Sequence, residues 1–459
     1  SDVYKRQVFI TSIFSIVSFN TFAKTTVTWW AETNADRDPV FQAKLVDAFN
    51  ASQNEIELVM EFKEGLNDIL RTAMLSGEGP DIVETPGPSY VKEYQEAGLL
   101  TSMQGYSNQF GWEDKLLPWS YQAGVFDGEF YSAPKTFESM IMLYNKTLFE
   151  ENGWSVPTTL GEYEDVASKI KAAGMNVFAY GSTGWQPTHE HLAGMYLNSY
   201  AGPDNVYKAL IGEKEWTDPE FTGAIELLRK HMVDDGYWSG SLENYYALGW
   251  DDFHAMFASR GAAMMTIGTW TFGATTAGFA DISDEWDWAP FPVLRDGGAD
   301  PSYLLALGTT MSINGSSENP DAAAEVLNFV FSNKEIVLDM AADFQFGEFV
   351  VPLYFAEDDI KDSVSPQVRR YLVDFAEATG KGNYGYTTWT FWPADPGVHI
   401  WKDMEVVWAG DISVEDYMYD HQKMWDKARK KGQLLPAVSY THLRAHETKA
   451  NLVCRLLLE

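Results

Sequence analysis

The N-terminal part of the chain alternates between short apolar runs and longer segments with helical spacing. Apolar, strand-like runs lie at 27–30, 56–60 and 81–83. Between them, residues 38–50 and 66–75 repeat apolar side chains at the three- and four-residue intervals of an amphipathic helix. Strands joined through a helix run parallel, because the crossover returns the chain to the same end of the sheet. The alternation therefore predicts an α/β fold built on parallel strands.

Later segments carry helical spacing or capping residues. The side chain of Thr159 can cap a helix that starts at residue 160, with Glu162 placed to complete a capping box. Helices are expected at 90–97, 148–152, 160–173, 190–200, 219–234, 250–258, 320–332, 335–342 and 413–430.

Length and charge limit the classes of protein that the chain can belong to. A chain of 459 residues is too long for one ordinary core and predicts two lobes. A formal net charge of −33 repels nucleic acid and anionic membrane surfaces, which excludes both as partners. Aromatic residues make up 15% of the chain, with 17 Trp. That is more than cores need, and it is typical of surfaces that bind ring-shaped ligands.

A search for catalytic and metal-binding motifs gives little. The chain has no G-x-S-x-G motif and no phosphate-binding glycine loop. The one tempting metal cluster is His189-Glu190-His191, but histidines two apart on a helix point different ways. We therefore expect the two histidines to be solvated or to line a cleft, with no metal and no cofactor. The acidic residues are too numerous for a catalytic pair to be chosen, so a glycosidase is unsupported rather than excluded.

The two ends of the chain differ from the rest. Residues 1–23 have the layout of a secretory signal peptide: Lys5 and Arg6, an apolar run, and small residues at Thr21 and Ala23. The opening residues and the segment 439–459 resemble translated adapter sequence and are expected to be non-native. The single cysteine, Cys454, lies in that tail, so no disulfide and no lipid anchor are expected. These features predict export to the periplasm as a freely soluble protein.

Four separated stretches resemble family 1 extracellular solute-binding proteins of ABC sugar importers, the maltose-binding-protein group. The two most specific are LYNKTLF at 143–149 and FASRGAAMM at 257–265, the latter followed by Gly-Thr-Trp at 268–270. The others lie at 79–100 and 128–134. Their order and spacing fit the family from residue 26 to about residue 436.

The resemblance implies the type II periplasmic-binding-protein fold, an α/β fold of two lobes with the solute between them. The N-terminal lobe is expected to contain residues 24–136 and 305–360, and the C-terminal lobe residues 137–304 and 361–438. The chain would cross between the lobes near 135–139, 304–309 and 359–366. The implied function is capture of a mono- or oligosaccharide by a monomer without turnover, followed by delivery to the membrane permease of an ABC importer.

Candidate ligand-binding residues come from the resemblance and from strand ends, where α/β sheets open to their clefts. Glu138 lies in the first crossing, at the position of a sugar-contacting carboxylate in maltose-binding protein, and Trp270 falls on the family's stacking tryptophan. The remaining candidates follow strands or lie in aromatic loops: Trp30, Glu32, Thr85, Trp185, Gln186, Trp389 and Trp392. Spacing does not decide which of the last two faces the cleft.

Other aromatic and acidic residues are expected to have structural roles. Asp251 and Asp252 precede a helix and are expected to cap it. Five tryptophans are assigned to the cores of the lobes: Trp112, Trp119, Trp216, Trp286 and Trp288.

Two alternatives to a sugar-binding protein stay open from the sequence. One is an exported carbohydrate-active enzyme with paired carboxylates, which would release reducing sugar from an oligosaccharide. The other is a binder of a cationic or osmolyte solute, which would place acidic residues where indoles are expected.

Deleting residues 1–23 and 439–459 is expected to leave folding intact, because neither segment continues the pattern of the rest of the chain. Circular dichroism during urea denaturation would test this. Loss of the cooperative transition in a chain of residues 24–438 would contradict the assignment of the two ends.

Overall fold

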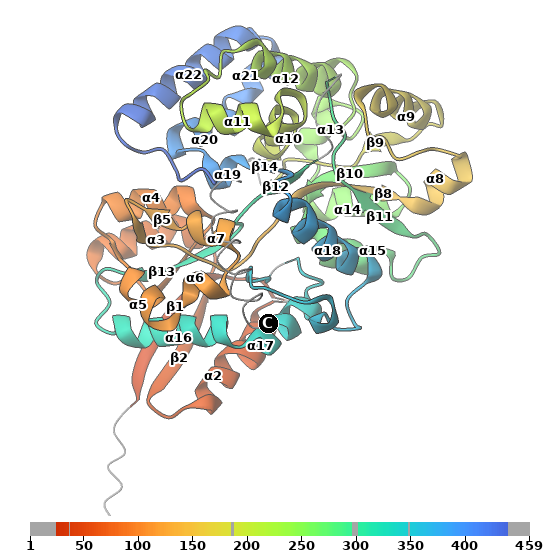
Figure 1. Cartoon of the computed structure of the whole chain (residues 1–459). Coiled ribbons are helices and arrows are strands. Elements are labelled where there is room, and N and C mark those ends of the chain that lie inside the picture. The colour runs from red at the N-terminus through yellow and green to blue at the C-terminus, as the bar shows by residue number, and fades with distance from the viewer. Residues whose placement is uncertain (1–23, 36, 185–187, 296–301, 348, 439–459) are drawn as a thin grey trace, which may run out of the picture.

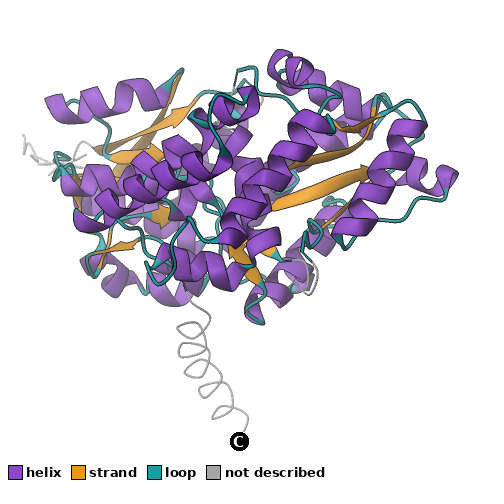
Figure 2. Ribbon diagram, turned by 90° about the horizontal axis from the view of Figure 1, so that it is seen from above, coloured by secondary structure: helices purple, strands orange, loops and turns teal. Residues whose placement is uncertain are grey.

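The protein forms two α/β lobes (Figure 1). The computed structural model describes residues 24–35, 37–184, 188–295, 302–347 and 349–438. Each lobe has its own sheet with helices packed around it (Figure 2). Within the described ranges, no helix has both the length and the apolar character needed to cross a bilayer. The predicted signal peptide and tail lie outside these ranges.

The first sheet has the strand order β2-β1-β3-β13-β4, with β7 paired to β13. β1 runs parallel to β2 and β3, as the alternation predicts. β13 is antiparallel to β3, β4 and β7, because it enters from the other lobe and not through a crossover helix. The strands are β1 (Thr25–Glu32), β2 (Ile56–Lys63), β3 (Ile82–Thr85), β4 (Leu100–Thr101), β7 (Ala133–Pro134) and β13 (Thr310–Asn314).

Helices from two distant parts of the sequence cover the first sheet. Figure 1 shows α16 and α17 alongside this sheet, although they follow the second lobe's strands in sequence. Their apolar faces join a core with Trp29, Phe41 and Met311. The helices of this lobe are α1 (Asp38–Phe41), α2 (Asp47–Ser52), α3 (Leu66–Ser76), α4 (Pro88–Glu96), α5 (Gln104–Phe110), α6 (Trp112–Lys115), α7 (Pro118–Gln122), α16 (Pro320–Ser332) and α17 (Lys334–Asp343), with a hairpin of β5 (Val125–Phe126) and β6 (Glu129–Phe130).

The second sheet has the order β11-β8-β10-β9 and is mainly antiparallel. β8 pairs antiparallel with β10 and β11, unlike the parallel strands predicted for the N-terminal part of the chain. The reason is that β8 leaves the crossing while β10 returns to it, with Gly268 opposite Met140. The strands are β8 (Met140–Asn145), β9 (Asn176–Phe178), β10 (Ala262–Gly268) and β11 (Trp286–Ala289), and a separate parallel pair is formed by β12 (Tyr303–Leu305) and β14 (Tyr384–Tyr386).

The second lobe is rich in helices, whose starts follow the capping signals in the sequence. At the start of α9 the hydroxyl of Thr159 accepts a hydrogen bond from the Glu162 amide, and the Glu162 carboxylate accepts one from the Thr158 amide. The helices are α8 (Lys146–Asn152), α9 (Leu160–Ala172), α10 (Thr188–Tyr196), α11 (Pro203–Leu210), α12 (Pro219–Arg229), α13 (Leu242–Ala247), α14 (Trp250–Ala258), α15 (Phe272–Phe279), α18 (Pro366–Gly380), α19 (Thr388–Phe391), α20 (Ala394–Lys402), α21 (Met404–Ala409) and α22 (Val414–Lys430).

Two crossing segments pair with each other where the lobes meet. The amide of Lys135 donates to the carbonyl of Thr309 at 2.9 Å, and the amide of Glu138 donates to the carbonyl of Ala306 at 3.0 Å. The amide of Thr309 in turn donates to the hydroxyl of Thr136. The segments 135–139 and 306–309 coincide with the first two crossings implied by the resemblance. The lobe boundaries beyond them stay a prediction.

A buried ion pair fixes the first crossing to the first sheet. Lys135 is 1% exposed, and its Nζ lies 2.7 Å from Oε2 of Glu84, a residue of β3. The indole N–H of Trp29 on β1 also donates to this oxygen, at 3.1 Å. The Lys135 ammonium lies 4.6 Å from the ring centroid of Phe41. The lysine therefore joins the crossing to β1, β3 and α1 in one buried network.

The five tryptophans assigned to cores are all buried, which confirms that prediction. Trp112 packs edge-on against Phe331 of α16, and Trp119 against Phe137 next to the crossing. Their exposed fractions are 0% for Trp112, 3% for Trp119, 0% for Trp216, 4% for Trp286 and 1% for Trp288.

Lys135→Ala is expected to lower the free energy of unfolding by about 3–5 kcal/mol, because it leaves the Glu84 carboxylate buried without its cation. Lys169→Ala is the matched control, since Lys169 pairs with Asp165 on the exposed face of α9 and such pairs contribute at most about 1 kcal/mol. Urea denaturation of both variants measures the difference. Equal losses would show that the buried pair has no special role.

Candidate functional site

A cavity of about 1160 Å³ lies between the two lobes. Its wall comes from α4 in the first lobe and from α10, α19 and α20 in the second. The crossing segments contribute Glu138 and Gly308. Both lobes and the segments that connect them therefore shape one space, which is open to solvent on one side.

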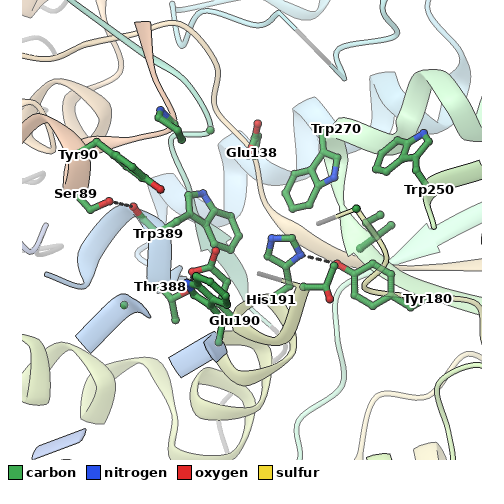
Figure 3. Close-up of a pocket in the computed structure, with 18 of the residues that line it drawn as sticks. Ser89, Tyr90, Glu138, Tyr180, Glu190, His191, Trp250, Trp270, Thr388 and Trp389 are labelled. Carbon is green, nitrogen blue, oxygen red and sulfur yellow. Dashed lines mark hydrogen bonds between the residues drawn. The ribbon is translucent and has the colours of Figure 1, made fainter. Parts of the chain in front are cut away.

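Three aromatic side chains, those of Trp270, His191 and Trp389, lie close together in the cavity, between Tyr90 and Trp250 (Figure 3). The rings of Trp270 and Trp389 lie 5.9 Å apart at 79°, so their faces are nearly perpendicular. The imidazole of His191 lies 5.0 Å from Trp270 and 5.1 Å from Trp389. The two indoles meet edge to face, so one flat ring cannot stack on both, and each indole offers its own apolar face.

Two glycines leave the space that the side chains of Trp270 and Glu138 occupy. A Cβ on Gly268 would lie 1.8 Å from the Trp270 ring, and a Cβ on Gly308 would lie 1.8 Å from Oε1 of Glu138. Each side chain therefore lies directly against glycine backbone. Because β10 pairs antiparallel with β8, Trp270 just after β10 comes to the same edge of the sheet as Glu138 just before β8.

Glu190 is a buried acid in the cavity wall. Its side chain comes from the first turn of α10, is 8% exposed and accepts a hydrogen bond at 3.0 Å from the hydroxyl of Thr388. Burial raises the pKa of Glu190 to about 8, against which the Thr388 hydrogen bond acts weakly. The carboxyl is therefore largely protonated at neutral pH.

The two histidines beside Glu190 point different ways, as expected for residues two apart on a helix. His191 Nδ1 lies 2.5 Å from the hydroxyl of Tyr180, whereas His189 Nδ1 lies 3.0 Å from the carbonyl of Trp401. Burial lowers the pKa of His191 to about 3 and that of His189 to about 4, so both are neutral. Among the described residues, no three His, Cys, Asp or Glu side chains converge as metal ligands do.

The first lobe faces Glu190 through α4. Tyr90 of α4 lines the cavity, and its pKa is raised by burial and by the nearby Glu190 carboxyl. The hydroxyl of Ser89 donates to the carbonyl of Trp389 at 3.3 Å, a direct contact between lobes. At the mouth, Tyr90 is 45% exposed and Trp250 is 42% exposed. The two aromatic side chains are open to solvent on the ligand-free surface.

Acidic groups outnumber basic ones around the cavity. Among its described lining residues, Glu93, Glu138, Glu190 and Asp343 carry carboxyls, and Arg37 carries the one guanidinium. An anionic ligand would meet unfavourable charge here, whereas a neutral or basic one would not.

Four of the nine residues predicted to bind ligand line the cavity: Glu138, Trp270, Trp389 and Trp392. Trp389 presents its ring beside Trp270 and His191. Trp392 is 0% exposed, packs against Trp216 and directs its indole N–H to His421, so it is mainly a core residue. Trp389 is thus the one of the two that faces the space. Trp185 and Gln186 lie outside the described residues.

Three predicted residues do not line the cavity. The carboxylate of Glu32 accepts hydrogen bonds from the amides of Gly65 and Leu66 and so caps the start of α3. Trp30 packs beside α3, with its ring 4.6 Å from Nζ of Lys63. Thr85 is buried in the first sheet, where its hydroxyl pairs with that of Thr310. These three residues are therefore not part of the cavity wall, whereas Asn34 and Pro86, which follow the same two strands, are part of it.

Sequence reasoning missed several cavity residues. The two histidines of the His189-Glu190-His191 segment were expected to be solvated or to line a cleft, and His191 does line the cavity. Nothing in the spacing marks Glu190 as an acid buried in a wall. Asp252 does cap α14, by accepting a hydrogen bond from the Gly249 amide, but the adjacent Trp250 at the mouth was overlooked. The missed residues are Tyr90, Tyr180, Glu190, His191 and Trp250.

The sequence of this chain is similar to those of known proteins. A sequence profile described as "Bacterial extracellular solute-binding protein" matches residues 31–336, more than half of the 459 residues. The chain belongs to this family. A multiple sugar-binding protein of Streptococcus mutans is 26% identical over 250 residues, which cover 50% of this chain and 54% of the relative.

A second solute-binding protein extends the likeness over more of the chain. A maltotriose-binding protein of Pyrococcus abyssi is 23% identical over 326 residues, covering 68% of this chain and 64% of the relative. The matches thus span between about half and two thirds of these two relatives.

A solved chitin oligosaccharide binding protein superposes with a TM-score of 0.74 at 20% identity, covering 88% of this chain and 99% of that one. The two lobes have the type II periplasmic-binding-protein fold that the sequence predicts.

Glu190→Gln is expected to stabilise this solute-binding protein increasingly as pH rises from about 4.5 to about 8. In that window the folded chain keeps a proton that the unfolded chain, with an ordinary Glu pKa of 4.5, has released, so rising pH destabilises the wild type. Glutamine does not titrate. The advantage of the variant should grow by a few kcal/mol, at about 1.4 kcal/mol per pKa unit, and level off above pH 8.

Urea denaturation of both chains between pH 5 and 9 measures this difference, and the histidines cancel because both chains share them. Glu57→Gln, an exposed carboxylate on β2, is the control and should show a constant difference. A constant difference for Glu190→Gln as well would contradict the protonated carboxyl.

Proposed function

We propose that the protein captures a mono- or oligosaccharide in the interlobe cavity outside the cytoplasmic membrane and delivers it to the permease of an ABC importer. It acts as a monomer without turnover. The observation that carries this proposal is the pair of perpendicular indoles, Trp270 and Trp389, in an interlobe cavity that also holds carboxyl groups.

The chemistry of the wall matches the two surfaces of a pyranose. The C–H face of a sugar ring packs on aromatic faces, which Trp270 and Trp389 supply. Its hydroxyls form hydrogen bonds with carboxyl groups, which Glu138 and Glu190 supply. The excess of acids over Arg37 favours neutral sugars over sugar acids and sugar phosphates.

The size of the cavity favours an oligosaccharide. Pockets for drug-sized ligands measure roughly 300–1,000 Å³, and this one is larger, at about 1160 Å³. The exposed rings of Tyr90 and Trp250 at the mouth would extend the aromatic surface beyond the inner pair. The relatives named for multiple sugars and for maltotriose support the same class of ligand.

The position of the cavity accounts for the handover step. A ligand held between two lobes favours the closed arrangement, and hinge closure about crossing segments is a common way to signal occupancy. The segments 135–139 and 306–309 are the paired crossings around which such motion would occur. A membrane partner that recognises the closed form would then receive only loaded protein.

Trp270→Ala is expected to weaken saccharide binding about 5- to 150-fold. The estimate follows from about 1–3 kcal/mol for a stacked aromatic, by analogy with base stacking, at 1.4 kcal/mol per tenfold change. Calorimetric titration with the sugars found by a thermal-shift screen measures it. Trp30→Phe is the matched control, because Trp30 lies beside α3 and does not line the cavity.

Equal affinities of Trp270→Ala and the wild type would remove the stacking role. Steady release of reducing sugar from an oligosaccharide by the wild type would favour a carbohydrate-active enzyme over a binding protein.

A further inference from the structure

We infer that Glu190 is a specificity-determining residue that meets the ligand as an uncharged carboxylic acid and donates a hydrogen bond to an acceptor oxygen of a neutral saccharide. Ring, glycosidic and acetamido oxygens are acceptors of this kind. The inference rests on the proposed function and specifies which groups of the sugar the inner wall recognises. Figure 3 shows Glu190 among the cavity residues, between His191 and Thr388.

The first support is burial without a counter-charge. Glu190 is 8% exposed, and within the described part of the chain no Lys or Arg side chain forms an ion pair with it. An isolated carboxylate in such a place costs several kcal/mol and takes up a proton instead. This is why burial raises the pKa of Glu190.

The titratable groups around Glu190 are themselves uncharged. Tyr90 faces it from α4 and Tyr180 from the segment after β9, and burial raises the pKa of both hydroxyls. His191 and His189 flank it on α10 with lowered pKa values. None of these groups supplies a positive charge at neutral pH.

The other helices packed against α10 place no charged group against Glu190. α19 contributes the Thr388 hydroxyl. α20 contributes the carbonyl of Trp401 to His189, and its charged residues Asp395 and Lys402 have no effect on the pKa of Glu190. α12 packs its apolar side chains into the same core. The groups that act on Glu190 are therefore polar but neutral.

The hydrogen bond from Thr388 decides how the acid can be used. The Thr388 hydroxyl donates to Oε2 of Glu190, so that oxygen acts as the acceptor. With Oε2 as the acceptor, we place the acid proton on Oε1, from which the acid can donate to the ligand. A buried acid kept neutral in this way acts as a hydrogen-bond donor.

The consequence is that opposite sides of the cavity recognise different sugar groups. The half-buried Glu138, against Gly308 in the crossing, accepts hydrogen bonds from sugar hydroxyls. Glu190 donates to oxygens that can only accept, which distinguishes the orientation of a sugar and the position of its linkage. The other acids of the lining, Glu93, Glu138 and Asp343, disfavour uronates and sugar phosphates.

The protonation state of Glu190 can be tested without ligand. Infrared difference spectroscopy of wild type minus Glu190→Gln should show a carboxylic-acid C=O band at pH 7 that disappears by pH 10. Absence of the band at pH 7 would overturn the inference, whether or not any sugar binds.

Its use in recognition is tested by calorimetric titration with maltotriose and N,N′-diacetylchitobiose between pH 6 and 10. Wild-type affinity should be flat up to pH 7 and about tenfold weaker at pH 9, because only the protonated fraction binds. Glu190→Gln keeps a donor, so it should lose affinity only a few-fold at pH 7 and show no pH dependence. Glu190→Leu keeps no donor and should lose at least tenfold.

The controls separate the two proposals. Glu57→Gln, exposed on β2, should retain the wild-type pH profile. If Glu190→Gln loses as much affinity as Glu190→Leu at pH 7, the residue acts as a carboxylate and the inference fails while sugar binding stands. If neither sugar binds the wild type, the proposed function fails for these sugars, and the infrared band still decides whether Glu190 is an acid in the wall.

Discussion

The pairing of the two crossing segments underlies the rest of the structure. The hydrogen bonds of Lys135 with Thr309 and of Glu138 with Ala306 join the lobes at one place. The buried contact of Lys135 with Glu84 holds that place against the first sheet. β8 leaves from it and β10 returns to it, which brings the segments before and after these strands to one edge of the cavity. A displacement of this pairing would therefore move both Glu138 and Trp270.

Features that depend on local sequence were predicted well. Helical spacing and caps located α3, α9, α12, α14, α16 and α22 to within a few residues, because an amphipathic pattern constrains a helix wherever it packs. Glu138 and Trp270, which were selected from the resemblance, both line the cavity, because each lies in or next to a crossing whose place in the chain is fixed by the fold. The assignment of five tryptophans to the cores was also correct, because a large apolar ring is usually buried.

Features that depend on tertiary packing were not predictable from one sequence. The strand-end rule indicates which edge of a sheet opens to a cleft, but not which side chain turns toward it. Glu32 instead meets the free amides at the start of α3, and Thr85 meets Thr310 on a strand more than two hundred residues later in the chain. The antiparallel course of β8 and the burial of Glu190 likewise arise from elements that are distant in sequence.

Gly268 and Gly308, the two glycines next to the candidate binding side chains, affect how ligand specificity can change during evolution. A Cβ at position 308 would push aside the flexible end of the Glu138 side chain, whereas a Cβ at position 268 would meet the ring of Trp270. Replacing either glycine would therefore change the shape of the cavity while Glu138 and Trp270 stay in the sequence. Ligand specificity in a lineage can thus diverge through these glycines alone, most readily at position 308.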